Sequence, residues 1–195
     1  TTLTRHYLGF ACITLAATAH EGQLRKGTAI PYITHPVAVA GLVAQYGGDE
    51  DQQIAALLHD VLEDGGPQFA AQIGERFGPR VLAMVQACTD GVPDAQGHKA
   101  PWTERKRAYL LHLKNANEDA LLVSGCDKLN NARSILDDLV TIGPSVFDRF
   151  NAKLEGAVWY YEALSHLYTE RKAPMAKALA DTLLKIKRLV PSTSP

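Results

Sequence analysis

A histidine followed directly by an aspartate, His59-Asp60, is the pair of residues best suited to chemistry in this sequence. The preceding residues 54–58, IAALL, predict a buried helix. An imidazole and a carboxylate beside such a run are costly to bury unless they are paired or bind a metal ion. The pair alone is weak evidence, because a chain with 7 histidines can contain it by chance. Its apolar setting makes it a candidate site.

Two acids extend this segment. Glu63 follows His59 by four residues, and Asp64 follows Asp60 by four. On a continuous helix the four polar groups project from about one turn. The alternative is a helix end with exposed acids, since Gly65-Gly66 comes next. Acids at a helix C-terminus oppose the helix dipole, which favours a metal-binding or catalytic role.

Two distant segments supply further ligand types. His35 lies in PYITHP, residues 31–36, and Asp127 lies in VSGCDKLNNAR, residues 123–133. Alone, His35 is typical of a capping residue and Asp127 of a surface ion pair. With His59-Asp60 they give a mixed nitrogen and oxygen set that suits one divalent ion, such as Mn²⁺, Fe²⁺ or Zn²⁺. Spacing along the chain does not show whether the four residues converge.

The elements that must position these residues are helices, because helical periodicity recurs and strand alternation is scarce. We expect an all-α fold, a single helical bundle of about eight to ten helices. The expected helices span 4–24, 36–46, 51–64, 69–77, 80–89, 103–115, 119–139, 144–168 with a break near Phe150, and 174–189. Residues 90–101 are typical of a surface loop.

Composition and net charge predict the domain organisation, the classes of partner and the compartment. The 195 residues, 46% hydrophobic, predict one domain over residues 1–190 and a flexible tail over 191–195. A net charge of −1 gives no global basic field, so we expect no nucleic-acid partner. The apolar residues 8–19 are too few to span a bilayer, which predicts a first helix and no membrane partner. Three cysteines without a CxxC pair favour the cytoplasm.

Several motifs, in order, resemble the HD-domain alarmone hydrolases of the Rel/SpoT homologue superfamily. They are AHEGQLRKGTAIPYITHP at 19–36, AALLHDVLED at 55–64, FG at 77–78, CTDG at 88–91, WTERKRAY at 102–109 and DKLNNAR at 127–133. The resemblance spans roughly residues 5 to 170, and this ordered combination is far more specific than an HD pair alone. The chain is most similar to a single-domain small alarmone hydrolase, like the metazoan SpoT homologue, without synthetase or regulatory domains.

The resemblance implies a role for each chemical group. It implies one Mn²⁺ ion held by His35, His59, Asp60 and Asp127. It makes Glu63 and Asp64 the pair that orients and deprotonates the attacking water.

The same resemblance places the nucleotide. Arg25 and Lys26 meet its base and phosphates, and Asn131 lines the pocket. The stretch from Arg25 to His35 is one residue longer than the commonest bacterial pattern, and a surface basic pair is the structural alternative. An anionic nucleotide needs further cations, for which the candidates are Lys128, Lys99, Arg105 and Lys106.

The implied reaction is hydrolysis of ppGpp or pppGpp, or of the adenosine analogues, to pyrophosphate and the 5′-di- or triphosphate. The alternatives are another HD phosphohydrolase reaction, such as removal of the 2′-phosphate of NADPH, and a non-catalytic nucleotide-binding sensor. The base preference and the oligomeric state stay open.

Overall fold

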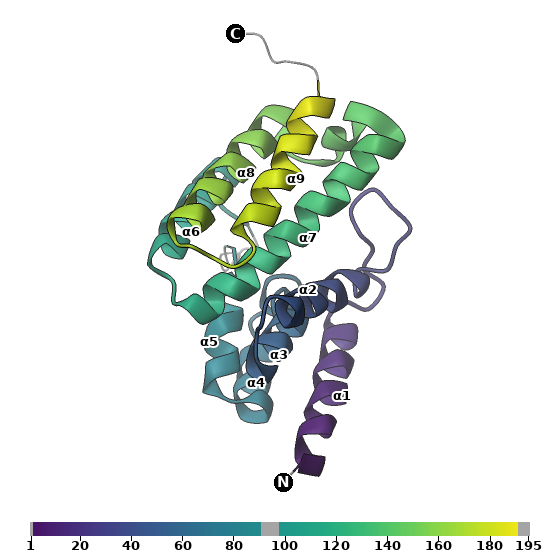
Figure 1. Cartoon of the computed structure of the whole chain (residues 1–195). Helices are drawn as coiled ribbons and strands as arrows, with labels where there is room; N and C mark the ends of the chain where they lie inside the picture. The colour runs from purple at the N-terminus through teal and green to yellow at the C-terminus, as the bar shows by residue number, and fades with distance from the viewer. Residues whose placement is uncertain (1, 91–97, 191–195) are drawn as a thin grey trace.

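The computed structural model describes residues 2–90 and 98–190 (Figure 1). Within these ranges the chain forms nine α-helices, one π-helical turn (η1) and one 3₁₀ segment (η2), and no strand. The all-α prediction is confirmed. The elements are α1 Thr2–Ala19, α2 Thr34–Gln45, α3 Glu50–Leu58, η1 Val61–Gly65, α4 Phe69–Phe77, α5 Pro79–Cys88, α6 Trp102–Asn115, α7 Glu118–Ile142, η2 Gly143–Arg149, α8 Lys153–Glu170 and α9 Ala176–Leu189.

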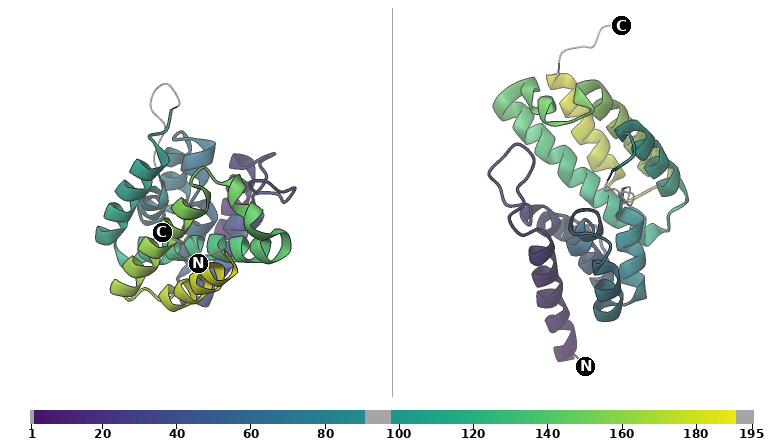
Figure 2. Two further views of the ribbon diagram at one scale, coloured as in Figure 1. Left: turned by 90° about the horizontal axis from the view of Figure 1, so that it is seen from above. Right: turned by 180° about the vertical axis from the view of Figure 1, so that it is seen from behind.

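Helix α7, with 25 residues, is the central element. It contacts α2, α3, α5 and α9, and α8 packs against both α9 and α6 (Figures 1 and 2). Its buried residues include the whole run Ala120–Asp127. Because α7 crosses the core, polar groups on it meet those carried by the N-terminal helices.

The first helix ends earlier than the sequence predicted. We expected it to run to Leu24, but α1 ends at Ala19, and residues 20–33 form the connection between α1 and α2. Gly22 has φ +72°, which is left-handed backbone that a helix cannot continue through. An isolated antiparallel bridge pairs Leu24 with Pro31. This α1–α2 connection lies beside α7 in two views (Figures 1 and 2).

The expected helix over 51–64 is also wrong at its end. Helix α3 stops at Leu58, and the five-residue π-turn η1 follows. The Gly66 amide donates to the Val61 carbonyl at 3.2 Å, an i to i+5 bond that widens the turn. Glu63 and Asp64 therefore lie in a widened turn and not on a continuous α-helix, although the Asp64 amide still donates to the Asp60 carbonyl at 2.9 Å.

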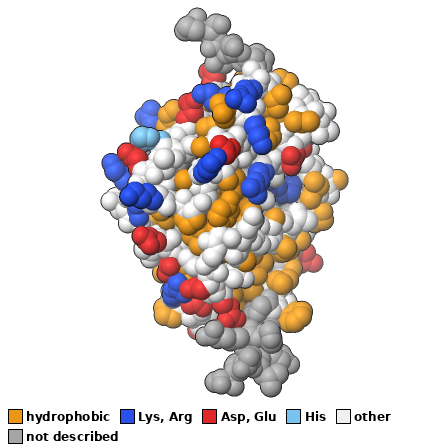
Figure 3. Space-filling model, viewed as in Figure 1, with side chains coloured by type: hydrophobic (Ala, Val, Ile, Leu, Met, Phe, Trp, Pro, Cys, Tyr) orange, Lys and Arg blue, Asp and Glu red, His pale blue; other side chains and the backbone are white. Residues whose placement is uncertain are grey.

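The remaining boundaries follow the periodicity. The break expected near Phe150 exists, since η2 ends at Arg149 and α8 begins at Lys153. Of the expected 90–101 loop, residues 91–97 lie outside the described residues, as does the expected tail, 191–195. No described helix combines the length and apolar character that a membrane crossing requires. On the face over α7–α9, cations and acids intermingle with apolar side chains (Figure 3).

Candidate metal centre and active site

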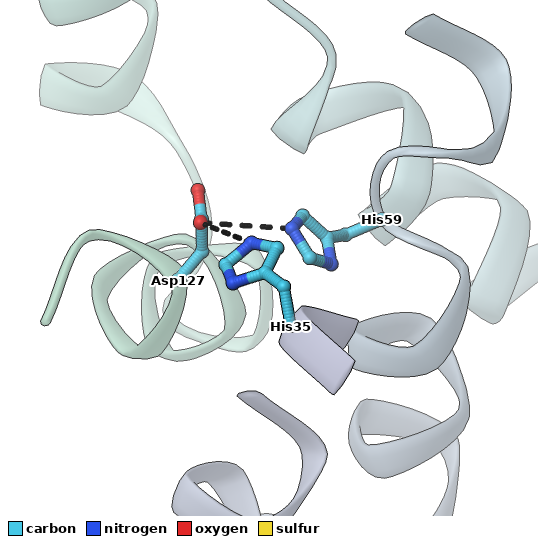
Figure 4. A group of neighbouring side chains, drawn as sticks. All are labelled: His35, His59 and Asp127. Carbon is cyan, nitrogen blue, oxygen red and sulfur yellow. Dashed lines mark ion pairs between the residues drawn. The ribbon is translucent and has the colours of Figure 1, made fainter. Parts of the chain in front are cut away.

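Two imidazoles and two carboxylates from three separate elements converge in the core. His35 lies in the first turn of α2, His59 and Asp60 follow α3, and Asp127 lies in the middle of α7. His35 Nε2 is 3.1 Å from Asp127 Oδ1, and His59 Nε2 is 3.6 Å from the same oxygen (Figure 4). Asp60 Oδ2 lies 3.0 Å from His59 Nε2 and 3.6 Å from His35 Nε2. The ligand atoms of His35, His59 and Asp127 thus form one group, and Asp60 Oδ2 lies beside both imidazoles.

The far sides of both imidazole rings are already engaged. His35 Nδ1 lies 2.7 Å from the side-chain oxygen of Asn130, and His59 Nδ1 lies 2.7 Å from the carbonyl of Ala56. Both oxygens only accept hydrogen bonds, so each Nδ1 donates to its oxygen and each Nε2 faces inward. This second contact is the usual way in which proteins orient a metal-ligating histidine.

The donor set fits a metal ion. The potential ligand atoms of His35, His59 and Asp127 all lie within 4.8 Å of one another, and all three residues are buried. His59 Nε2 is buried and makes no hydrogen bond with any described residue. A buried ring nitrogen without a hydrogen bond is costly in the protein alone, and a metal ion that took this nitrogen as a ligand would compensate the cost.

Electrostatics keep both carboxylates ionised. Burial would raise the pKa of Asp60, but the neighbouring His59 outweighs it and lowers this pKa below its usual range. For Asp127, burial is again opposed, by the Lys128 ammonium and the two imidazoles, and its pKa falls well below normal. Burial would lower the pKa of His59, yet Asp60 and Asp127 raise it. The centre therefore holds two ionised carboxylates beside the cationic Lys128 and the His59 imidazole.

Two further residues support the ligands, and the sequence analysis missed both. The Tyr32 hydroxyl donates to Asp60 Oδ2 at 2.6 Å, and Asn130 holds His35 as described above. A sequence signal existed for Asn130, because it lies three residues after Asp127, on the same face of one helix. Tyr32 precedes His35 by three residues, in the stretch that resembles the alarmone hydrolases.

The two proposed catalytic acids point to different neighbours. Glu63 Oε1 is 2.8 Å from Lys99 Nζ, and its Oε2 accepts from the Asp90 amide at 3.3 Å. Asp64 Oδ2 accepts from Gln23 Nε2 at 2.9 Å. The π-turn thus places one carboxylate toward the segment before α6 and the other toward the α1–α2 connection. Their catalytic use stays a prediction.

A cavity of about 560 Å³ opens beside the centre, and His35 forms part of its wall. The predicted substrate residues Arg25, Lys26, Lys128 and Asn131 all line it. Arg25 donates to Asn131 Oδ1 at 3.0 Å, and Asn131 donates to Asp127 Oδ1 at 2.6 Å. The cavity wall is therefore hydrogen-bonded directly to a candidate metal ligand.

Two further predicted cations, Lys106 and Arg105, contact a buried acid, and Lys106 also lines the cavity. Lys106 lines the cavity beside Trp102 and Tyr160, with Nζ 4.9 Å from the Tyr160 ring centre. Lys106 and Arg105 both pair with the buried Asp90 carboxylate. Lys106 of α6 therefore adds a cationic group to the cavity wall, whereas Arg105 contacts Asp90 without lining the cavity.

Comparisons with known proteins agree with this geometry. The HD domain family model matches residues 12–154. Guanosine-3′,5′-bis(diphosphate) 3′-pyrophosphohydrolase of Haemophilus influenzae is 50% identical over 127 residues, 62% of this chain and 18% of that protein. Guanosine-3′,5′-bis(diphosphate) 3′-pyrophosphohydrolase MESH1 of Xenopus tropicalis is 37% identical over 123 residues, 62% of this chain and 65% of that protein. The chain therefore spans less than two thirds of each curated relative's length.

A solved structure extends the similarity to three dimensions. It is a metazoan orthologue of SpoT, described as hydrolysing ppGpp. It matches this chain with a TM-score of 0.58 and 26% identity, over 84% of this chain and 95% of that chain.

Proposed function

This chain belongs to the HD domain family, and from that premise we propose that it is a metal-dependent 3′-pyrophosphohydrolase of purine alarmones. Its substrates are ppGpp and pppGpp, with ppApp and pppApp as close analogues. The observation that carries the proposal is the convergence of His35, His59, Asp60 and Asp127 beside a cation-lined cavity. The names of the similar proteins, guanosine-3′,5′-bis(diphosphate) 3′-pyrophosphohydrolases, support the same substrate class.

The metal centre would hold one divalent ion, and we propose Mn²⁺. When bound, such an ion stabilises negative charge on phosphoryl oxygens and makes water more acidic. Two neutral imidazole nitrogens and two carboxylate oxygens are a donor set that first-row divalent ions accept. The contacts of His35 with Asn130 and of His59 with Ala56 support this role, because they fix the tautomer that exposes Nε2.

The other predicted site residues act on the attacking water and on the nucleotide. Glu63 and Asp64 orient the attacking water and accept its proton. The water oxygen attacks the phosphorus bound to the 3′-oxygen, and the bond from that phosphorus to the 3′-oxygen breaks. The 3′-oxygen takes up a proton, so that the products are pyrophosphate and the nucleoside 5′-di- or triphosphate with a free 3′-hydroxyl. Arg25 and Lys26 bind the base and phosphates from the cavity wall, together with Lys128 and Asn131.

The broader setting is proposed on the same grounds. Residues 1–190 act as one hydrolase domain. The protein works in the cytoplasm, since its three cysteines are buried and include no CxxC pair. Its partner is the nucleotide, and nucleic acids and membranes are not among its ligands.

The test is incubation of metal-free and Mn²⁺-loaded protein with ppGpp, ppApp and NADPH, with the products separated by anion-exchange chromatography. We expect pyrophosphate release from at least one alarmone, only in the Mn²⁺-loaded sample. Release of inorganic phosphate from NADPH, without pyrophosphate release from either alarmone, would indicate the 2′-phosphatase reaction. Binding without turnover would indicate a nucleotide sensor. Full activity after verified metal removal would refute the metal-dependent mechanism.

A further inference from the structure

The α1–α2 connection contacts Asp60, just before the π-turn, and Asp64, within it. Its first contact is through Tyr32, whose hydroxyl donates to Asp60 Oδ2 at 2.6 Å. The Tyr32 ring also packs edge-on against His35, with ring centres 5.7 Å apart. One side chain therefore touches two members of the metal centre, and it fixes which Asp60 oxygen faces the imidazoles.

The second contact passes through a buried histidine. His20 is 4% exposed, and its Nδ1 lies 2.8 Å from Gln23 Oε1. The amide oxygen only accepts, so His20 Nδ1 donates to it, and the opposite end of the same amide, Nε2, donates to Asp64 Oδ2 at 2.9 Å. The buried ring thus sets the orientation of the amide. Asp64 receives a donor aimed by a chain of two hydrogen bonds.

The two contacts are coupled to each other. The His20 and Tyr32 rings pack with their centres 4.8 Å apart. The Tyr32 amide donates to the Gln23 carbonyl at 2.9 Å, next to the Leu24–Pro31 bridge. His20 Nε2 is buried without a hydrogen bond to any described residue. A buried ring nitrogen without a hydrogen bond lowers the stability of the fold, so its presence calls for an explanation. The orientation of the Gln23 amide by the other nitrogen of the same ring is such an explanation.

We propose that the α1–α2 connection is a positioning device in which Tyr32 orients the metal ligand Asp60 and the His20–Gln23 pair orients the catalytic acid Asp64. The roles of Asp60 and Asp64 rest on the proposed function. The device predicts two separable defects: loss of the Tyr32 contact weakens metal binding, whereas loss of the Gln23 contact slows turnover with metal and substrate binding intact.

The experiment compares Tyr32→Phe and Gln23→Glu with wild type. Mn²⁺ affinity is measured by calorimetry without substrate, and kcat and KM for ppGpp are measured with saturating Mn²⁺. We expect Tyr32→Phe to weaken Mn²⁺ binding about tenfold, as losses of such supporting contacts do. We expect Gln23→Glu to lower kcat about tenfold at unchanged KM and Mn²⁺ affinity. The glutamate keeps an oxygen that accepts from His20, but it places a carboxylate oxygen beside Asp64 where the wild-type amide donates a hydrogen bond.

Three further variants make the comparison interpretable. Gln23→Met removes the donor without adding charge and should show the same loss of kcat. Gln86→Glu, on the exposed face of α5, and Tyr46→Phe, at the end of α2, carry the same chemical changes away from the site and should match wild type. Thermal unfolding of all variants reports on the fold.

The outcomes separate this proposal from the proposed function. If wild type binds Mn²⁺ but hydrolyses no alarmone, the proposed function fails, while the effect of Tyr32→Phe on Mn²⁺ affinity still tests the metal contact. If kcat of both Gln23 variants stays within about twofold of wild type, the Asp64 contact does not position a catalytic acid. If every variant at Tyr32 and Gln23 loses stability, affinity and kcat together, the connection is only structural and the proposal is overturned.

Discussion

Replacing Asp127 by alanine should abolish the stabilisation of the fold by Mn²⁺. An ion that binds only the folded chain adds about 2.7 kcal/mol when its concentration is 100 times Kd. For a chain of this size each kcal/mol raises Tm by about 2–4 °C, so wild type should gain about 5–11 °C. Asp127 supplies the oxygen 3.1 and 3.6 Å from the two imidazole Nε2 atoms, and without it the Mn²⁺-dependent gain should disappear.

The same substitution should also destabilise the metal-free protein. Asp127 is 5% exposed and pairs with the ammonium of Lys128, whose side chain is 11% exposed. Removing one partner of a buried pair leaves an uncompensated charge, at a cost of about 3 kcal/mol. We therefore expect a fall in Tm of about 6–12 °C without metal.

The assay is thermal unfolding followed by circular dichroism, with chelator and with a titration of Mn²⁺. Asp138→Asn is the matched control, because Asp138 lies on the same helix and pairs with Arg149 at 2.7 Å, away from the metal centre. It should keep the wild-type gain. An Asp127→Ala variant that gains as much Tm from Mn²⁺ as wild type would show that Asp127 is not a ligand, and the assignment of the centre would be wrong.

Three other substitutions test separate parts of the site and the fold. The double variant Glu63→Gln with Asp64→Asn should lower kcat by about 10²–10⁴ at unchanged KM; a parallel loss of Mn²⁺ affinity would place these acids among the ligands. Arg25→Ala should raise KM about tenfold, since alanine neither stacks on a purine nor pairs with phosphate; an unchanged KM for ppGpp, ppApp and NADPH would misplace the substrate site. Ser124→Ala should lower Tm by about 4–8 °C, because Ser124 hydrogen-bonds two buried tyrosine hydroxyls at 2.8 Å; an unchanged Tm would contradict this.

Helix positions were predictable because apolar periodicity and Gly or Pro punctuation are local properties. Helix α4, expected at 69–77, is observed at Phe69–Phe77, and α6 and α9 differ from expectation by one or two residues at their ends. The errors lie where local pattern competes with tertiary contacts. Residues 20–24 continue a helical pattern, but Gly22 and the pairing of Leu24 with Pro31 turn them into a connection.

The candidate site was predictable in residue type but not in geometry. Local motifs and the family resemblance pointed to His59, Asp60, His35 and Asp127, yet only a fold that brings α2, α3 and α7 together makes them neighbours. The tautomer of each histidine depends on an acceptor behind the ring. For His59 this acceptor is a backbone carbonyl, Ala56 O, which no residue pattern reveals.

The π-turn is a departure from regular structure that apolar periodicity does not predict. On a continuous α-helix, Glu63 would lie one turn beyond His59, on the same face. In the structure the wide turn η1 holds Glu63 beside Lys99 and Asp64 beside Gln23. Asp60, just before the turn, keeps its Oδ2 beside the two imidazoles. The two proposed water-activating acids and the proposed ligand Asp60 therefore lie on one short segment, and each has its own contacts.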